Sequence, residues 1–193
     1  PSITPDGNQI ITSDEALEMA KVPREMVIIG GGYIGVEFAT LFNTLGSRVT
    51  IVEILENILP GLEGELVRNL RRFMERDGIR ILTQSSVEEI QYGENGLRLT
   101  VKTPQGIEEV IIEKLLVAAG RGPSLDLSFS KAGVEISPQG IKVNRRMGTT
   151  APGIYAIGDA IEGIMLAHVA MEQGIVAAEN AIGMDQEMKD NPI

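Results

Sequence analysis

Three glycines and one acidic residue have the types and the spacing to bind a phosphate-containing ligand. Gly30, Gly32 and Gly35 stand in the stretch GGGYIG, between a short apolar run and a helical pattern. In such a stretch the first glycine makes a tight turn, the second lets a pyrophosphate approach the backbone, and the third lets helix and strand pack closely. Free N–H groups at the helix start would then hold the phosphate charge.

Glu53 ends the next expected strand, close to the spacing of about 20 residues that dinucleotide-binding folds show at this point. Its carboxylate could accept both ribose hydroxyls and would repel a 2′-phosphate, and the surrounding IVEILEN contains no Arg or Lys. The sequence therefore predicts NAD rather than NADP. The alternative is a glycine-rich turn in another doubly wound fold, because the glycine pattern alone arises often by chance.

The composition excludes several kinds of site. The 193 residues include no Cys and one His, which rules out disulfides, cysteine nucleophiles, zinc fingers, iron–sulfur ligation and multi-histidine metal sites. We therefore predict no catalytic and no metal-binding residue in this chain. The formal net charge of -10 argues against nucleic acid or an acidic membrane surface as a partner.

No stretch of the sequence has the length of a membrane-spanning helix. The longest apolar one, Met26–Val36, falls short of the roughly 18 residues required and is rich in glycine. The first residues, PSITPDG, contain no basic or apolar leader, so we expect a cytoplasmic protein. The absence of an initial Met indicates a piece cut from a longer chain.

The apolar pattern from residue 24 to residue 122 predicts alternating strands and helices. Apolar residues recur at helical spacing over 34–45 and 66–74, and a glycine follows each run. Short buried strands are expected at residues 26–29, 48–53, 79–82 and 115–120. Strand, helix, strand, helix, strand is a βαβαβ unit, so we predict an α/β fold with a Rossmann-like parallel sheet.

The remaining segments have other patterns. From Val87 the apolar period changes to two, which predicts a three-stranded β-meander. Near the N-terminus, Ser13 or Asp14 would cap a short helix. In the loosely patterned C-terminal part we expect a strand at 154–157, a helix at 166–182 and a polar, frayed tail.

Several segments in a fixed order resemble a known family. They are GGGYIGVEF with RVTIVE, then LLVAAGRGP, TTAPGIYAIGD and MLAHVAMEQG. Together they resemble the flavin-dependent pyridine nucleotide disulfide oxidoreductases, and within these the dihydrolipoamide dehydrogenases. The resemblance covers nearly the whole chain, and the order of the motifs makes it more specific than any one of them.

The resemblance implies a set of residues that contact NAD. Those that match the family's NAD loop and ribose acid are Gly30, Gly31, Gly32, Ile34, Gly35 and Glu53. Val87 and Gly120 match positions that line the adenosine and nicotinamide ends. Tyr33 matches an aromatic gate over the nicotinamide pocket, or is a packed aromatic. Arg121 would neutralise the pyrophosphate or pair with an acid such as Asp126.

The resemblance also implies contacts with FAD. Glu37 matches an acid that faces a lysine beside the flavin, or it faces solvent in this chain. Asp159 matches the carboxylate that hydrogen-bonds the ribityl chain. Met165, Leu166, Ala167 and His168 match the helix start beneath the isoalloxazine, where partial positive charge would stabilise a reduced flavin. We interpret His168 as a contact near the flavin rather than as a general base.

The same resemblance predicts the domain organisation. Residues 1–23 would be the end of an FAD-domain segment and a linker, 24–122 the NAD-binding domain, and 123–193 a partial, FAD-contacting central domain. The family's first FAD glycine motif, its redox cysteine pair and its C-terminal interface domain with a His–Glu base are not in this sequence. We therefore expect an interior fragment that is inactive alone, with exposed apolar surface at 154–182 that is mobile or covered by a second copy.

In the complete enzyme, the resemblance implies electron transfer from dihydrolipoamide through a disulfide and FAD to NAD. The implied partners are the missing FAD and interface domains and the lipoyl domains of a 2-oxo acid dehydrogenase complex, and a homodimer is one expected assembly. Two alternatives remain open, a non-catalytic NAD-binding module and one half of a split flavoprotein. A short-chain dehydrogenase is disfavoured, because no Tyr precedes a Lys by four residues.

Overall fold

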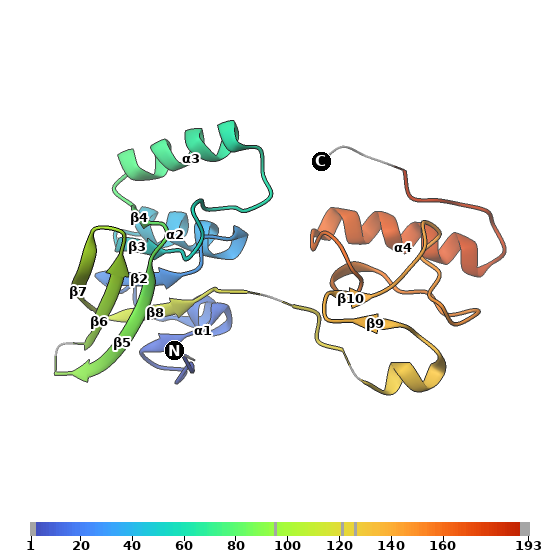
Figure 1. The fold of residues 1–193 in the computed structure, drawn as a ribbon, viewed down its shortest axis with the longest axis horizontal. Coiled ribbons are helices and arrows are strands. Elements are labelled where there is room, and N and C mark those ends of the chain that lie inside the picture. Colours follow the sequence, from blue (N-terminus) through green and yellow to red (C-terminus); the bar gives the residue numbers. More distant parts are fainter. Residues whose placement is uncertain (1–2, 95, 121, 126, 190–193) are drawn as a thin grey trace. The chain divides into compact units, whose positions relative to one another are not determined.

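The computed structural model describes residues 3–94, 96–120, 122–125 and 127–189. The chain divides after Gly120 into two compact units, residues 1–120 and residues 121–193. In Figure 1 the first unit runs from blue to yellow-green and the second from yellow to red.

Unit 1 is built on a five-stranded sheet in which every pairing is parallel. Its strand order is β1-β8-β2-β3-β4. The bounds are β1 Ile10–Ile11, β2 Glu25–Ile29, β3 Arg48–Val52, β4 Arg80–Leu82 and β8 Lys114–Val117. The predicted parallel α/β sheet is thus confirmed. The pairing of β1 with β8 also places the N-terminal segment within this unit, a contact that the sequence pattern did not indicate.

Three helices cover one face of this sheet: α1 Ser13–Glu18, α2 Tyr33–Thr44 and α3 Gly64–Arg76. Ile28 and Ile51 of the sheet pack in one cluster with Ala39 of α2 and Val67 of α3. The predicted cap of α1 was wrong by one residue, because Thr12 and Glu15 form a capping box.

The antiparallel meander covers the opposite face. It consists of β5 Ser86–Gly93, β6 Gly96–Thr103 and β7 Gly106–Ile112, in the order β5-β6-β7. Leu97, Leu99 and Val101 point from β6 into a second cluster with Val27 and Leu115 of the parallel sheet. Strand residues alternate between the two faces, so the central strands are buried on both sides.

Unit 2 has little regular structure. It contains the 3-10 helix η1 Leu127–Ala132, β9 Ile136–Ser137, β10 Gly140–Ile141, the 3-10 helix η2 Gly158–Ala160 and α4 Ala167–Ala181. The predicted strand at 154–157 was wrong. Tyr155 forms only an isolated bridge with Gly148, and a turn from Ala151 to Ile154 and the positive φ of Gly158 leave no room for a longer ladder.

The tail after α4 is held in place as far as Met188, so the predicted fraying was wrong for residues 184–188. The Met188 N–H donates to the Arg145 carbonyl at 2.8 Å. The Gln186 N–H donates to Asn180 Oδ1 at 2.9 Å, and Asn180 Nδ2 donates back to the Gln186 carbonyl at 2.8 Å. A buried amide on α4 thus pairs with the tail backbone.

Candidate functional site

The glycine loop joins β2 to α2, and its first residue, Gly30, cannot be replaced by another residue without strain. Gly30 has φ +105, and a Cβ there would lie 2.5 Å from the Ala118 carbonyl oxygen at the end of β8. The Gly30 N–H donates to the Val52 carbonyl at 2.9 Å. The tight turn and the close backbone approach both require glycine here.

The other two motif glycines differ sharply in their surroundings. A Cβ on Gly35 would lie 1.9 Å from the Gly30 carbonyl oxygen, because α2 packs directly on the loop. A Cβ on Gly32 would meet nothing within 4 Å. Gly32 is the N-cap of α2 and supplies no side-chain acceptor. The first turn of α2 therefore opens onto free space, as a bound pyrophosphate requires.

Glu53 is buried beneath the loop, with 7% of its surface exposed. Its Oε2 accepts the Gly31 N–H at 2.5 Å and its Oε1 accepts the Leu55 N–H at 2.8 Å. The sequence predicted a ribose acceptor but not these backbone contacts. A carboxylate has about four acceptor sites, so both oxygens keep capacity for ligand hydroxyls.

Other predicted NAD-binding residues lie in varied surroundings. Tyr33, the first residue of α2, is 51% exposed, and Ile34 is half-buried. Val87 lies on β5 of the meander, and its side chain is buried in the core between the meander and the parallel sheet. Gly120 is exposed beyond β8 with φ +91. Arg121 and its alternative partner Asp126 lie outside the described residues.

Of the predicted FAD-contacting residues, Glu37 is exposed on α2 of unit 1, and the others belong to unit 2 and lie near the N-terminal half of α4. Asp159 is exposed in η2. Met165, Ala167 and His168 are exposed, and the half-buried Leu166 is the N-cap of α4 without a side-chain hydrogen bond. The structure thus presents the predicted carboxylate and helix start to solvent.

Gln173 holds η2 against α4, a role that the sequence reasoning missed. Its Oε1 accepts the Gly158 N–H at 2.8 Å, and the side chain is buried. A polar residue on the buried side of an amphipathic helix was the available signal. Through this contact Gln173 fixes the segment that carries Asp159.

One side of α4 is apolar and exposed, which confirms the expected apolar surface at 154–182. Met171 is 73% and Ile175 60% exposed, and Ala167, Ala178 and Ile182 lie on the same side at spacings of three or four. We call these five residues the apolar face of α4. The opposite side packs into the core of unit 2 through Val176 and Ala177.

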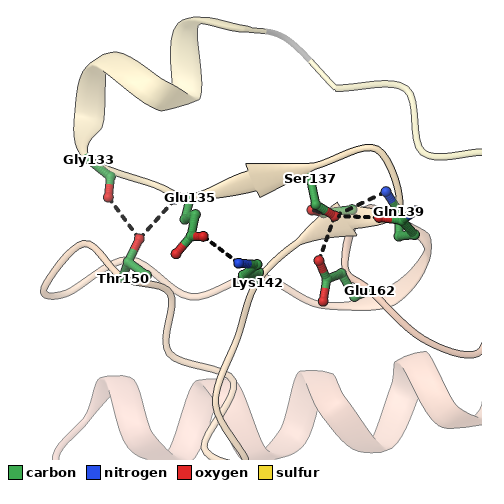
Figure 2. Close-up of polar contacts among 8 residues, drawn as sticks. Gly133, Glu135, Ser137, Gln139, Lys142, Thr150 and Glu162 are labelled. Carbon is green, nitrogen blue, oxygen red and sulfur yellow. Dashed lines mark hydrogen bonds and ion pairs between the residues drawn. The ribbon is translucent and has the colours of Figure 1, made fainter.

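A shallow cavity of about 290 Å³ in unit 2 is lined by Glu135, Lys142, Val143, Asn144, Gly148, Thr149 and Thr150. Figure 2 shows that its charged groups are paired, with Lys142 bonded to Glu135. The hydrogen bond from Lys142 to Glu135 raises the pKa of the ammonium group. Thr150 accepts the Glu135 N–H and donates to the Gly133 carbonyl, each at 2.8 Å. These contacts join neighbouring loops.

Across residues 3–94, 96–120, 122–125 and 127–189, no three His, Cys, Asp or Glu side chains gather as a metal site would require. In the same residues, no helix is both long enough and apolar enough to span a bilayer.

A glycine loop between the first strand and helix of a parallel βαβ unit, with an acid on the next strand, defines a Rossmann-type dinucleotide-binding fold. The family model described as pyridine nucleotide-disulphide oxidoreductase matches residues 3–174. This chain belongs to that family.

Individual relatives agree with this assignment. The chain is 40% identical to dihydrolipoyl dehydrogenase from Thermus scotoductus over 184 residues, which cover 93% of the chain and 40% of that protein. LpdA from Mycobacterium tuberculosis has a similar structure, with a TM-score of 0.84 and 26% identity over 98% of this chain and 42% of that one. The HOCl-induced flavoprotein disulfide reductase RclA from Escherichia coli has a TM-score of 0.82 and 28% identity, over 97% and 43%. The chain spans about two-fifths of the length of these relatives.

Proposed function

We propose that unit 1 binds NAD at the glycine loop, as the nucleotide-binding part of an NAD-dependent dihydrolipoyl dehydrogenase. The observation that carries the proposal is the contrast among the three glycines. Gly30 and Gly35 are in tight backbone contact, while Gly32 faces open space at the start of α2. This is the division of roles that a pyrophosphate site requires.

In this proposal each part of the loop has a separate task. The first N–H groups of α2 would hold the pyrophosphate. Glu53 would accept the ribose hydroxyls while it keeps its contacts to the loop backbone. Residues 54–62, ILENILPGL, contain no Arg or Lys that would favour a 2′-phosphate, which supports NAD over NADP. Tyr33 and Gly120 would lie at the nicotinamide end.

Unit 2 would complete a flavin site in the whole protein. Asp159 would accept hydrogen bonds from the ribityl chain, and the start of α4 at Met165–His168 would place partial positive charge beside the flavin ring. Bound FAD would supply the electron transfer between a disulfide and NAD. The sequence given contains no Cys, so we expect the chain alone to have no dihydrolipoamide activity.

The partners in this proposal come from the rest of such an enzyme. They are its other FAD-domain half, its interface domain and the lipoyl domains of a 2-oxo acid dehydrogenase complex, with a homodimer as the expected assembly. The identity to dihydrolipoyl dehydrogenases supports this choice of substrate class. We expect the protein to act in the cytoplasm.

Isothermal titration of the chain with NAD and with NADP tests the proposal. Wild type should bind NAD in preference to NADP. Glu53→Gln keeps one acceptor oxygen but loses the charge, so NAD affinity should fall about tenfold and the preference should narrow. Glu18→Gln makes the same chemical change at an exposed position away from the loop, so it serves as the matched control and should bind like wild type.

Two results would contradict the proposal. The first is an absence of heat for either nucleotide from a chain whose circular dichroism shows it folded. The second is NADP binding as tight as NAD binding in wild type.

A further inference from the structure

We propose that the connecting segment, residues 54–62 between β3 and α3, positions the glycine loop by clamping Gly31. The proposal rests on the proposed function, because it concerns the same nucleotide. Gly31 occupies a variable position of the GxGxxG pattern, so the motif itself does not require glycine there. Its φ also lies outside the left-handed region that favours glycine.

Two hydrogen bonds and one close approach of a side chain fix Gly31. Its N–H donates to Glu53 Oε2 at 2.5 Å. Its carbonyl accepts the Leu59 N–H at 2.7 Å. A Cβ at this position would lie 2.7 Å from Ile58 Cγ2 and 3.2 Å from Ile58 Cβ. Glu53 Oε2 would also lie 3.2 Å from this Cβ, but the Cγ2 methyl group of Ile58 makes the closest approach and is the main obstacle to a side chain at Gly31.

The connecting segment is anchored firmly enough to act as a clamp. Ile58 is fully buried and Leu59 is 5% exposed, and both belong to the cluster that includes Val36 and Ala39 of α2. Leu59 has φ +50, a strained conformation for a branched side chain, which persists only where the surroundings enforce it. The Leu55 carbonyl also accepts the Gln84 N–H at 2.9 Å, beyond β4.

The clamp determines where the loop directs one of its donors. The carbonyl of Gly31 and the N–H of Gly32 belong to one planar trans peptide, so they point in opposite directions. When Leu59 binds the carbonyl, the Gly32 N–H must point away from the connecting segment. Gly32 is the open N-cap of α2, where the nucleotide phosphates are proposed to lie. Ile58 and Leu59 are thus positioning residues for the nucleotide site.

A pair of double variants tests the clamp. Gly31→Ala should weaken NAD binding about tenfold, because overpacking must displace the loop or Ile58. Ile58→Leu removes the methyl group at the Cγ2 position while it keeps the volume, so the double variant Gly31→Ala/Ile58→Leu should recover most of the affinity. Ile58→Val retains Cγ2, so its double variant with Gly31→Ala should not recover. Titration of the single variants Ile58→Leu and Ile58→Val with NAD shows how much each change at Ile58 alters the affinity by itself.

Amide hydrogen exchange without nucleotide measures the clamp directly. Gly31→Ala should accelerate exchange at Leu59, and the double variant with Ile58→Leu should restore it. The clamp would be overturned if Gly31→Ala bound NAD as tightly as wild type, or if Ile58→Leu and Ile58→Val restored the NAD affinity of Gly31→Ala equally. Neither result would contradict the proposal that unit 1 binds NAD. If wild type binds no NAD but exchange follows this pattern, the proposed function fails and the clamp stands. If the exchange rate at Leu59 were the same in Gly31→Ala as in wild type, the clamp would be overturned whether or not the chain binds NAD.

Discussion

The glycine loop of unit 1 and the apolar face of α4 in unit 2 differ in how far their groups are already in contact with the rest of their own unit. At the loop, backbone and carboxylate groups from β2, β3 and the connecting segment satisfy one another, and only the N-terminus of α2 is open. On α4, Met171 and Ile175 are exposed although the opposite side of the helix is packed. A small ligand suits the first region, whereas an exposed apolar helix face such as the second is typical of a protein contact.

The cores of the two units differ in the same way. The sheet of unit 1 is covered by helices on one face and by the meander on the other, so its central strands are fully buried. Unit 2 has one small cluster, formed mainly by α4 and the short strands and loops packed on it. We therefore expect unit 1 to be the more stable of the two units.

Truncation of a buried side chain in unit 1 tests this difference between the two cores. Ile28 is fully buried in the central strand β2, and Ile28→Ala should lower the free energy of unfolding by about 3–4 kcal/mol. Urea denaturation measures this loss. Hydrogen exchange in the same variant should rise across residues 25–52 and stay unchanged in α4. Equal acceleration in α4 would show that the two units unfold together and would break the comparison.

A pair of glycine variants separates packing from ligand contact within the loop. Gly35→Ala drives a Cβ into the Gly30 carbonyl, so it should cost about 2 kcal/mol or more of stability and abolish NAD binding. Gly32→Ala meets no neighbouring atom, so it should change stability by less than about 0.5 kcal/mol and weaken only NAD binding. Thermal unfolding and titration measure the two effects. Equal stability losses in both variants would contradict the assigned roles.

Changes on the apolar face of α4 should affect surface behaviour more than stability. The double variant Met171→Gln/Ile175→Gln should alter the free energy of unfolding by less than about 0.5 kcal/mol, because both side chains are exposed. It should reduce the fluorescence of a bound apolar dye. Glu65→Gln on α3 is the exposed control and should leave dye binding unchanged. A large loss of stability would mean that the face is already covered, for example by a second copy.

The smallest expected effect concerns the cap of α3. Hydrogen bonds from the Glu65 and Leu66 N–H groups lower the pKa of Glu63, so the ionised form stabilises the folded state. This contribution is present above the unfolded pKa, about pH 4, and is lost as pH falls through the lower folded pKa. Glu63→Gln should therefore lower the melting temperature slightly at pH 7 but not at pH 3. An equal difference at both pH values would exclude the charge as the cause.

The sequence pattern predicted most of unit 1 because its signals are local and repeated. Buried β-strands, helices closed by glycine and the GxGxxG spacing each depend on a few neighbouring residues. In unit 2 the segment 154–157 has strand-like composition, but among the described residues it finds only the single bridge at Tyr155. Local propensity cannot supply a missing partner strand.

Most of the missed contacts of the candidate site are long-range. One backbone hydrogen bond of Glu53 reaches 22 residues back along the chain to Gly31, and the approach of Ile58 to the same glycine depends on how the connecting segment folds. The tail seemed polar and free in sequence, yet Asn180 and Arg145 hold it through backbone groups that no side-chain pattern reveals. The spacing of residues in the sequence predicts which of them can contact a ligand. It does not predict which backbone groups their side chains already bind.

Hydrogen exchange of the wild-type chain with and without NAD shows which unit holds the nucleotide. NAD should protect the amides of residues 31–36, at the glycine loop and the first turn of α2, and should leave exchange in α4 unchanged. Protection confined to unit 2, or no protection anywhere at a saturating NAD concentration, would contradict the assignment of the nucleotide site to unit 1.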